Sequence, residues 1–228
     1  MPVLSVVCVS LCALWLALVV TVQLLTPGQS PLRMGMSGLA VGPHGWAMKA
    51  AFVARGAAAC VLAAGLPGAL LPGWRLTVGF ALFWVWGVGS VLLALYDTDM
   101  PGDTPTRRGR AHALVALVSY LAALAAVITL SPALMRSGGT AITAWWALPI
   151  ALAAALFLLL QSIAFWQQAR AAAARASAER LAAPAASRPL EPRVSPPPAP
   201  RLGAYAGLLQ RVYVGLIMVW TVLAAVSF

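Results

Sequence analysis

The residues in this sequence that could do chemistry are few, and most of them fall near the ends of apolar segments. Asp97 and Asp99 follow one such segment, and His112 opens the next. A carboxylate and an imidazole in this arrangement could act as general acid and base, because histidine titrates near neutral pH. Arg55 and Arg211 lie inside apolar segments, where a charge is costly and indicates a functional site with a charged partner.

We expect Arg55 or Arg211 to pair with Asp97 or Asp99, either to tie helices together or to prepare a site for an anionic headgroup. Snorkelling of the side chain to the lipid headgroups is the alternative for Arg55. Asp99 and His112 are the catalytic candidates if the protein is an enzyme. The predicted polar cluster comprises Ser37, Arg55, Asp97, Asp99, His112 and Arg211.

The sequence predicts no cofactor and no metal. Asp97, Asp99 and Asp103 lie near one turn and could hold Mg²⁺ or Ca²⁺, but the three arginines within 107–110 neutralise these acids more simply. Haem ligation by the two histidines is not favoured, because His44 falls in a predicted loop. No G-x-S-x-G motif and no serine triad stand out.

The composition places these residues in a membrane. The chain has 228 residues, of which 62% are hydrophobic and 9% are charged, whereas soluble domains carry about 25% charged residues. This excludes a soluble enzyme fold and a secreted disulfide scaffold. The net charge of +10 comes from cations scattered beside apolar segments, which indicates membrane orientation rather than nucleic-acid binding.

Six segments approach the roughly 20 apolar residues that a spanning helix needs, and in lipid each must be a helix. The sequence therefore predicts an all-α integral membrane protein, a six-transmembrane-helix bundle. Pro67 and residues 72–73 are expected to surround a turn, and Pro132 to end the fourth span. The predicted spans are 3–25, 50–71, 74–96, 111–130, 140–166 and 204–228.

The segments form one domain in three parts. Residues 1–166 make a five-span membrane bundle. Residues 167–203 form a cytoplasmic Ala/Arg/Pro-rich helix, to about residue 183, followed by a proline-rich mobile linker. The sixth span, 204–228, is expected to pack on the same bundle.

The basic residues predict the orientation. Eleven of the 15 fall in the loops after the first, third and fifth spans, and such loops face the cytoplasm. We therefore expect a multi-pass protein of the bacterial inner (cytoplasmic) membrane with both termini outside.

Three motifs carry a family resemblance. Residues 31–46, with Ser37 in their middle, are similar to a first-loop signature of apolar-Ser-x-Leu-small-x-Gly type. Residues 96–99 followed by 109–112 resemble aromatic-Pro-Thr-Asp and then Gly-x-x-His, with Asp97 in the place of Pro. Residues 207–211 resemble the Gln-Arg start of a last span. In this order the motifs resemble a bacterial membrane family catalogued as domain of unknown function 998.

The resemblance implies a compact bundle in which Ser37, Asp99, His112 and Arg211 lie near one another, and it implies no reaction. We expect a non-enzymatic accessory or binding subunit that contacts membrane lipids or a larger membrane-protein complex, and no nucleic acid. The alternative is an enzyme for a lipid-linked or phosphorylated substrate, in which Arg211 would hold the phosphate. A small transporter is a second alternative.

Overall fold

The computed structural model describes residues 2–100, 103–136, 141–182 and 202–227. Within this part, six helices are long and apolar enough to cross a membrane, so the all-α prediction with six spans is confirmed. Two short 3₁₀ helices lie in the connections. The helices are α1 (Pro2–Leu25), η1 (Met36–Ala40), α2 (Gly45–Ala69), α3 (Trp74–Leu92), α4 (Arg107–Arg136), α5 (Ala141–Ala182), η3 (Gly203–Tyr205) and α6 (Ala206–Val226).

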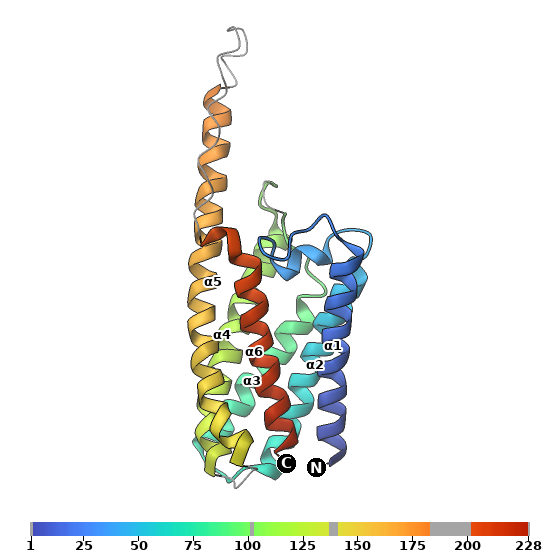
Figure 1. Ribbon diagram of the computed structural model, residues 1–228, viewed down its shortest axis with the longest axis vertical. Helices are drawn as coiled ribbons and strands as arrows, with labels where there is room; N and C mark the ends of the chain where they lie inside the picture. Colours follow the sequence, from blue (N-terminus) through green and yellow to red (C-terminus); the bar gives the residue numbers. More distant parts are fainter. Residues whose placement is uncertain (1, 101–102, 137–140, 183–201, 228) are drawn as a thin grey trace.

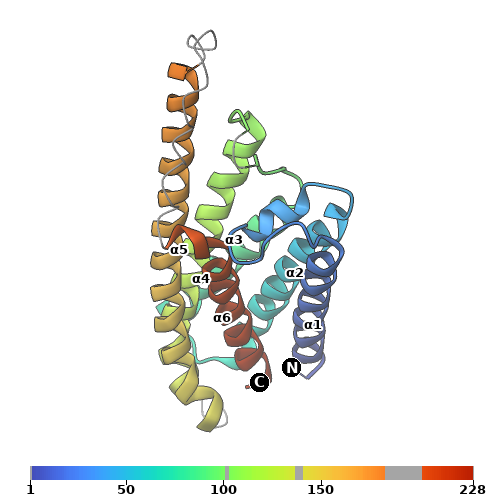
Figure 2. The same cartoon turned by 45° about the horizontal axis from the view of Figure 1, so that its top comes forward.

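Helices that follow one another in the chain pack side by side, and α6 closes the bundle by contacting α1 as well as α5 (Figure 1). The N- and C-terminal ends lie together at one end of the bundle. The opposite end holds residues 26–44 between α1 and α2, which we call the first loop, and the segment between α3 and α4 (Figures 1 and 2). We call this end the loop end.

Small residues bring the helices into close contact. A Cβ atom added to Gly56 of α2 would lie 2.5 Å from the carbonyl oxygen of Gly87 on α3, so the two backbones touch. Gly79 and Gly89 of α3 likewise face Leu130 and the Ser119 hydroxyl of α4. This is the packing expected where lipid supplies no hydrophobic drive for helices to associate and close contact must replace it.

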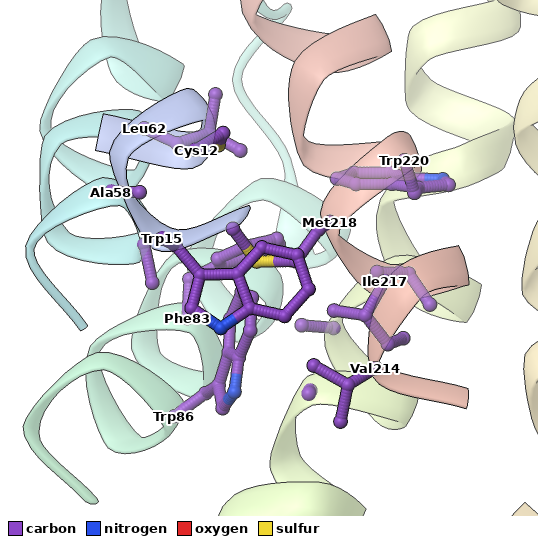
Figure 3. Packing of buried hydrophobic residues seen from close by; sticks show 14 of the residues in the cluster. Cys12, Trp15, Ala58, Leu62, Phe83, Trp86, Val214, Ile217, Met218 and Trp220 are labelled. Carbon is purple, nitrogen blue, oxygen red and sulfur yellow. The ribbon is translucent and has the colours of Figure 1, made fainter. Parts of the chain in front are cut away.

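An aromatic cluster fills the centre of the bundle (Figure 3). The Phe83 ring lies edge-on to Trp86 at a centroid distance of 5.5 Å and stacks on Trp220 of α6 at 5.7 Å. The Trp220 indole donates a hydrogen bond of 3.0 Å to the Ser131 hydroxyl of α4. This bond satisfies the polar atom of a fully buried ring, and it joins α6 to α4.

One expectation about a helix end is wrong: α4 continues through Pro132 to Arg136. α2 includes Pro67 and ends at Ala69, within the predicted span 50–71 and before residues 72–73 of the expected turn. Each proline lies in the last turns of its helix, and membrane helices tolerate the lost N–H donor when local adjustments satisfy the freed carbonyl.

α5 extends well past the bundle at the loop end (Figure 1). It reaches Ala182, in agreement with a helix predicted to about residue 183. The predicted proline-rich linker, 184–200, lies outside the described residues. α6 packs on the same bundle as the other helices.

A matched pair of substitutions tests the glycine packing. Gly56→Ala places a methyl group against the Gly87 carbonyl and should lower the free energy of unfolding by about 1–3 kcal/mol. Gly215→Ala, on α6, meets nothing within 4 Å and should leave stability unchanged or raise it slightly. Thermal unfolding of the purified protein in detergent measures both. Equal stability of the two variants would contradict the close contact.

Candidate functional site

The first loop lies directly on the beginning of α6. A Cβ atom at Gly207 would collide with the carbonyl oxygens of Pro31 and Met34, so only glycine permits this approach. The Leu208 amide, one of the first-turn N–H groups without a partner inside its own helix, donates to the Leu32 carbonyl at 3.1 Å. The loop backbone thus completes the N-terminus of α6.

Arg211 of α6 binds the same loop. Its Nη1 donates to the carbonyl oxygens of Pro31 at 2.9 Å and Met34 at 2.8 Å, and its Nη2 donates to Oε1 of Gln23 on α1 at 2.7 Å. All these acceptors are neutral. The guanidinium is half-buried, and in the described part of the chain its charge is not balanced by a carboxylate.

Gln210 continues the connection into the interior. Its Oε1 accepts a 2.7 Å hydrogen bond from the Met36 amide, and its Nε2 donates to the Tyr120 hydroxyl of α4 at 2.9 Å. The Tyr213 hydroxyl in turn donates to the Tyr120 carbonyl at 2.6 Å. Four buried polar groups from η1, α4 and α6 are therefore joined, as buried polar groups require.

His112, in the first turns of α4, joins two connections. Its Nδ1 lies 2.7 Å from the carbonyl oxygen of Tyr96, and its Nε2 lies 2.9 Å from the hydroxyl of Ser37 on η1. The imidazole is 3% exposed and packs against the Phe52 ring. The structure thus brings together two of the predicted residues, Ser37 and His112.

Asp99 caps α4 through Thr106. The carboxylate accepts hydrogen bonds from the Thr106 amide at 2.9 Å and the Thr106 hydroxyl at 2.7 Å, and that hydroxyl accepts from the Gly109 amide at 2.9 Å. Because these bonds favour the ionised form, they hold the pKa of Asp99 below its ordinary value. Asp99 also explains Gly109, where a Cβ atom would collide with the carboxylate.

The two remaining residues of the predicted cluster, Asp97 and Arg55, have separate partners. Asp97 forms an ion pair with Lys49 at 2.7 Å, in which both side chains are more than one third exposed, so it contributes about 0–1 kcal/mol. Arg55 is fully buried; its Nε donates to Ser90 at 3.2 Å and its guanidinium lies 5.3 Å from the Phe52 ring centroid. Its Nη1 and Nη2 have no hydrogen-bond partner among the described residues.

The expected pairing of Arg55 or Arg211 with Asp97 or Asp99 is therefore wrong. Asp97 forms an ion pair with Lys49, and Asp99 accepts a hydrogen bond from Thr106. Arg211 donates its hydrogen bonds to neutral acceptors, among them the Met34 carbonyl. The physical reason is that unpaired carbonyl groups of a close-lying loop compete with carboxylates for a guanidinium. The predicted acid–base pair also has no direct contact, since the partners of His112 are Tyr96 and Ser37.

Sequence reasoning missed several polar residues of this site. Gln210 and Tyr120 are buried, and Gln168 of α5 donates to the carbonyl oxygens of Arg33 and Gly203. Gln210 stands within the motif 207–211, and an amide side chain inside an apolar span is a signal that could have identified it. Within the described ranges, no group of three or more His, Cys, Asp or Glu side chains could hold a metal ion.

Two cavities lie on opposite sides of the hydrogen-bonded contact between the first loop and α6. One, of about 540 Å³, is a groove between α1 and α6 that includes Met36 and Arg211 in its lining. The other, of about 340 Å³, is lined by Ser37, Gln210 and Asp99 and by α5 residues. Met36 and Ser37 are neighbours in sequence, as are Gln210 and Arg211, so adjacent residues serve opposite sides of one junction.

Acid titration tests the Asp99 cap. Because the folded-state pKa of Asp99 is depressed, the carboxylate stabilises the fold above its ordinary pKa of about 3.9, and this contribution is lost as the pH falls through the lower folded-state value. ¹³C NMR of labelled aspartate should place its midpoint below 3.9, and Thr106→Val should raise that midpoint. An unchanged midpoint in Thr106→Val would contradict the cap.

A family model described as "Protein of unknown function (DUF998)" matches residues 10–227. The match reaches all six spans and the loop-end residues described above. No curated protein and no solved structure matches the chain. The chain therefore belongs to the DUF998 family of proteins of unknown function.

Proposed function

We propose that this membrane protein binds an anionic lipid in the groove between α1 and α6, with the headgroup at Arg211. The observation that carries the proposal is a cation, unbalanced by a described acidic residue, at one end of an otherwise apolar groove. Arg211 is the charged residue of the lining. The apolar lining comprises Val9, Cys12, Ala13, Trp15, Leu16, Val19, Met36, Gly215, Met218, Val219, Val222 and Leu223.

The length of the groove fits an acyl chain. Arg211 and Leu223 are the first and last α6 residues of its lining, and twelve helical residues span about 18 Å. The hydrocarbon of one leaflet is about 15 Å thick, half of a 30 Å bilayer core. An acyl chain that starts beside Arg211 would therefore run down the groove to the middle of the membrane.

The charge at Arg211 favours a phosphate rather than a neutral headgroup. Hydrogen bonds within the described chain use Nη1 and Nη2, and none of them uses Nε–H. A phosphate oxygen would supply both the missing negative charge and an acceptor for this donor. The same cation stays bound to the loop carbonyls, so lipid binding requires no rearrangement of the fold.

The proposal includes the orientation of the protein. Arg33, Lys49 and the arginines within 107–110 lie at the loop end, and Arg75 and Arg136 lie at the opposite end. By the positive-inside rule the loop end faces the cytoplasm and both termini face outward, so the lipid would come from the cytoplasmic leaflet. The proposal keeps the expected accessory role in a bacterial inner membrane, in which the protein would present a lipid or be anchored by it.

Native mass spectrometry of the protein released from nanodiscs tests the proposal. The wild-type chain should keep phosphatidylglycerol in preference to phosphatidylcholine. Arg211→Gln should weaken phosphatidylglycerol binding about 10- to 100-fold, because a hydrogen bond to a charged group contributes about 1.5–3 kcal/mol. Gly215→Leu, which fills the groove at a position with free space, should weaken binding of both lipids.

Arg75→Gln is the matched control, because it removes one positive charge at the opposite end of the bundle and should leave lipid binding unchanged. Thermal unfolding of each variant shows that the fold is retained. Equal losses of both lipids in Arg211→Gln, or a second protein helix in the groove in place of lipid, would contradict the proposal.

A further inference from the structure

We propose that Ser37 is a nucleophile, that His112 is its general base, and that the cavity in front of Ser37 accepts an amphipathic carboxylic ester for acyl transfer to the Ser37 hydroxyl. This activity goes beyond the proposed lipid binding and uses the other cavity. The proposal depends on the two hydrogen bonds of His112 and on the different exposure of the two side chains.

The hydrogen bonds of His112 place its proton. A carbonyl oxygen can only accept a hydrogen bond, so the ring nitrogen that lies 2.7 Å from the Tyr96 carbonyl carries the proton of the neutral imidazole. The other nitrogen, Nε2, then presents its lone pair to the Ser37 hydroxyl at 2.9 Å. The hydroxyl donates to the imidazole, which is the direction that deprotonation of a serine nucleophile requires.

The Tyr96 carbonyl occupies the position of the orienting group in a serine–histidine catalytic arrangement. Such a group holds the imidazole in the correct tautomer and orientation. Ten residues separate Tyr96 from the beginning of α4, and the Asp99–Thr106 cap lies within them. The cap thus holds the segment that contains the Tyr96 carbonyl close to the N-terminus of α4, which carries His112.

The two side chains differ in their access to the cavity. His112 is 3% exposed and packed against Phe52, whereas Ser37 is half-buried and lines the cavity of about 340 Å³. The base is therefore shielded behind the nucleophile. A hydrogen bond that only tied η1 to α4 would need no cavity of ligand size in front of it, and 340 Å³ lies within the range of small-molecule sites.

The lining of the cavity indicates the substrate class. Met34, Met100 and Phe165 supply apolar surface, while Arg33, Gln168 and Gln210 supply polar groups. The cavity lies at the loop end, because its lining comes from the first loop, the segment between α3 and α4, α5 and the beginning of α6. A molecule with an alkyl chain and a polar portion joined by an ester satisfies both kinds of wall.

The reaction balances with water as the second reactant. Ser37 Oγ attacks the ester carbonyl carbon while its proton passes to His112 Nε2. The ester C–O bond breaks, and the leaving alkoxide takes that proton and departs as an alcohol. Water, deprotonated by Nε2, then attacks the acyl-serine, and the proton returns to Ser37 as the carboxylic acid leaves.

An alkyl fluorophosphonate probe tests the inference on the full-length wild-type protein in detergent. We expect one adduct, formed as Ser37 Oγ displaces fluoride from phosphorus, and peptide mass spectrometry should map it to Ser37. Ser37→Ala should abolish the adduct. His112→Asn should slow its formation about 100-fold or more, the usual contribution of a general base.

Ser162→Ala is the matched control, because the Ser162 hydroxyl bonds to the Leu158 carbonyl of its own helix, and it should leave labelling unchanged. Mapping on the wild-type protein holds even if Ser37→Ala fails to fold. A wild-type protein that forms no adduct, an adduct on another residue, or an unchanged rate in folded His112→Asn would overturn the proposal. None of these results depends on whether lipid occupies the α1–α6 groove.

Discussion

The structure depends on the satisfaction of backbone groups in the first loop by side chains from distant parts of the chain. Between α1 and α2 the chain folds back over the start of α6, and Met36 and Leu39 of this loop are buried. Gln210 of α6 accepts a hydrogen bond from the buried Met36 amide. Arg211 of α6 donates to the carbonyl oxygens of Pro31 and Met34, and Gln168 of α5 donates to that of Arg33. Because unsatisfied polar groups are costly away from water, this loop and the last span must form together.

The contact between the first loop and α6 determines how the candidate functional residues are arranged. It places Ser37 of η1 against His112 of α4, and it leaves Arg211 at the head of the α1–α6 groove. The charge of Arg211 is not neutralised within the described part of the chain, because its hydrogen-bond acceptors are neutral. The hydroxyl of Ser37 lines its cavity, and the buried His112 lies behind it. The two proposals, anionic lipid binding and acyl transfer, therefore arise on opposite sides of one junction.

The spans were predictable because hydropathy over about 20 residues is a sum of many small contributions. The error at Pro132 moved the end of α4 without changing the number of spans. The site was less predictable. Oppositely charged residues are easy to recognise in a sequence, and they suggested arginine–aspartate pairs. Every residue has a backbone carbonyl, so the sequence does not indicate which carbonyl oxygens bind Arg211. The Ser37–His112 contact joins residues 75 positions apart. The predicted polar cluster and the motif resemblance both included these two residues, but neither specified that they contact each other.

Hydrogen–deuterium exchange of the first loop in nanodiscs tests the central claim most directly. If side chains of α6 hold this loop, amides of residues 34–40 and Leu208 should exchange at least about 100-fold more slowly than those of Leu71 and Gly73 in the α2–α3 turn, because exchange requires opening of the contact between the loop and α6. Gln210→Leu should remove that protection from Met36 while the spans stay protected. Equally fast exchange of the first loop and the α2–α3 turn in the wild-type protein would contradict the account.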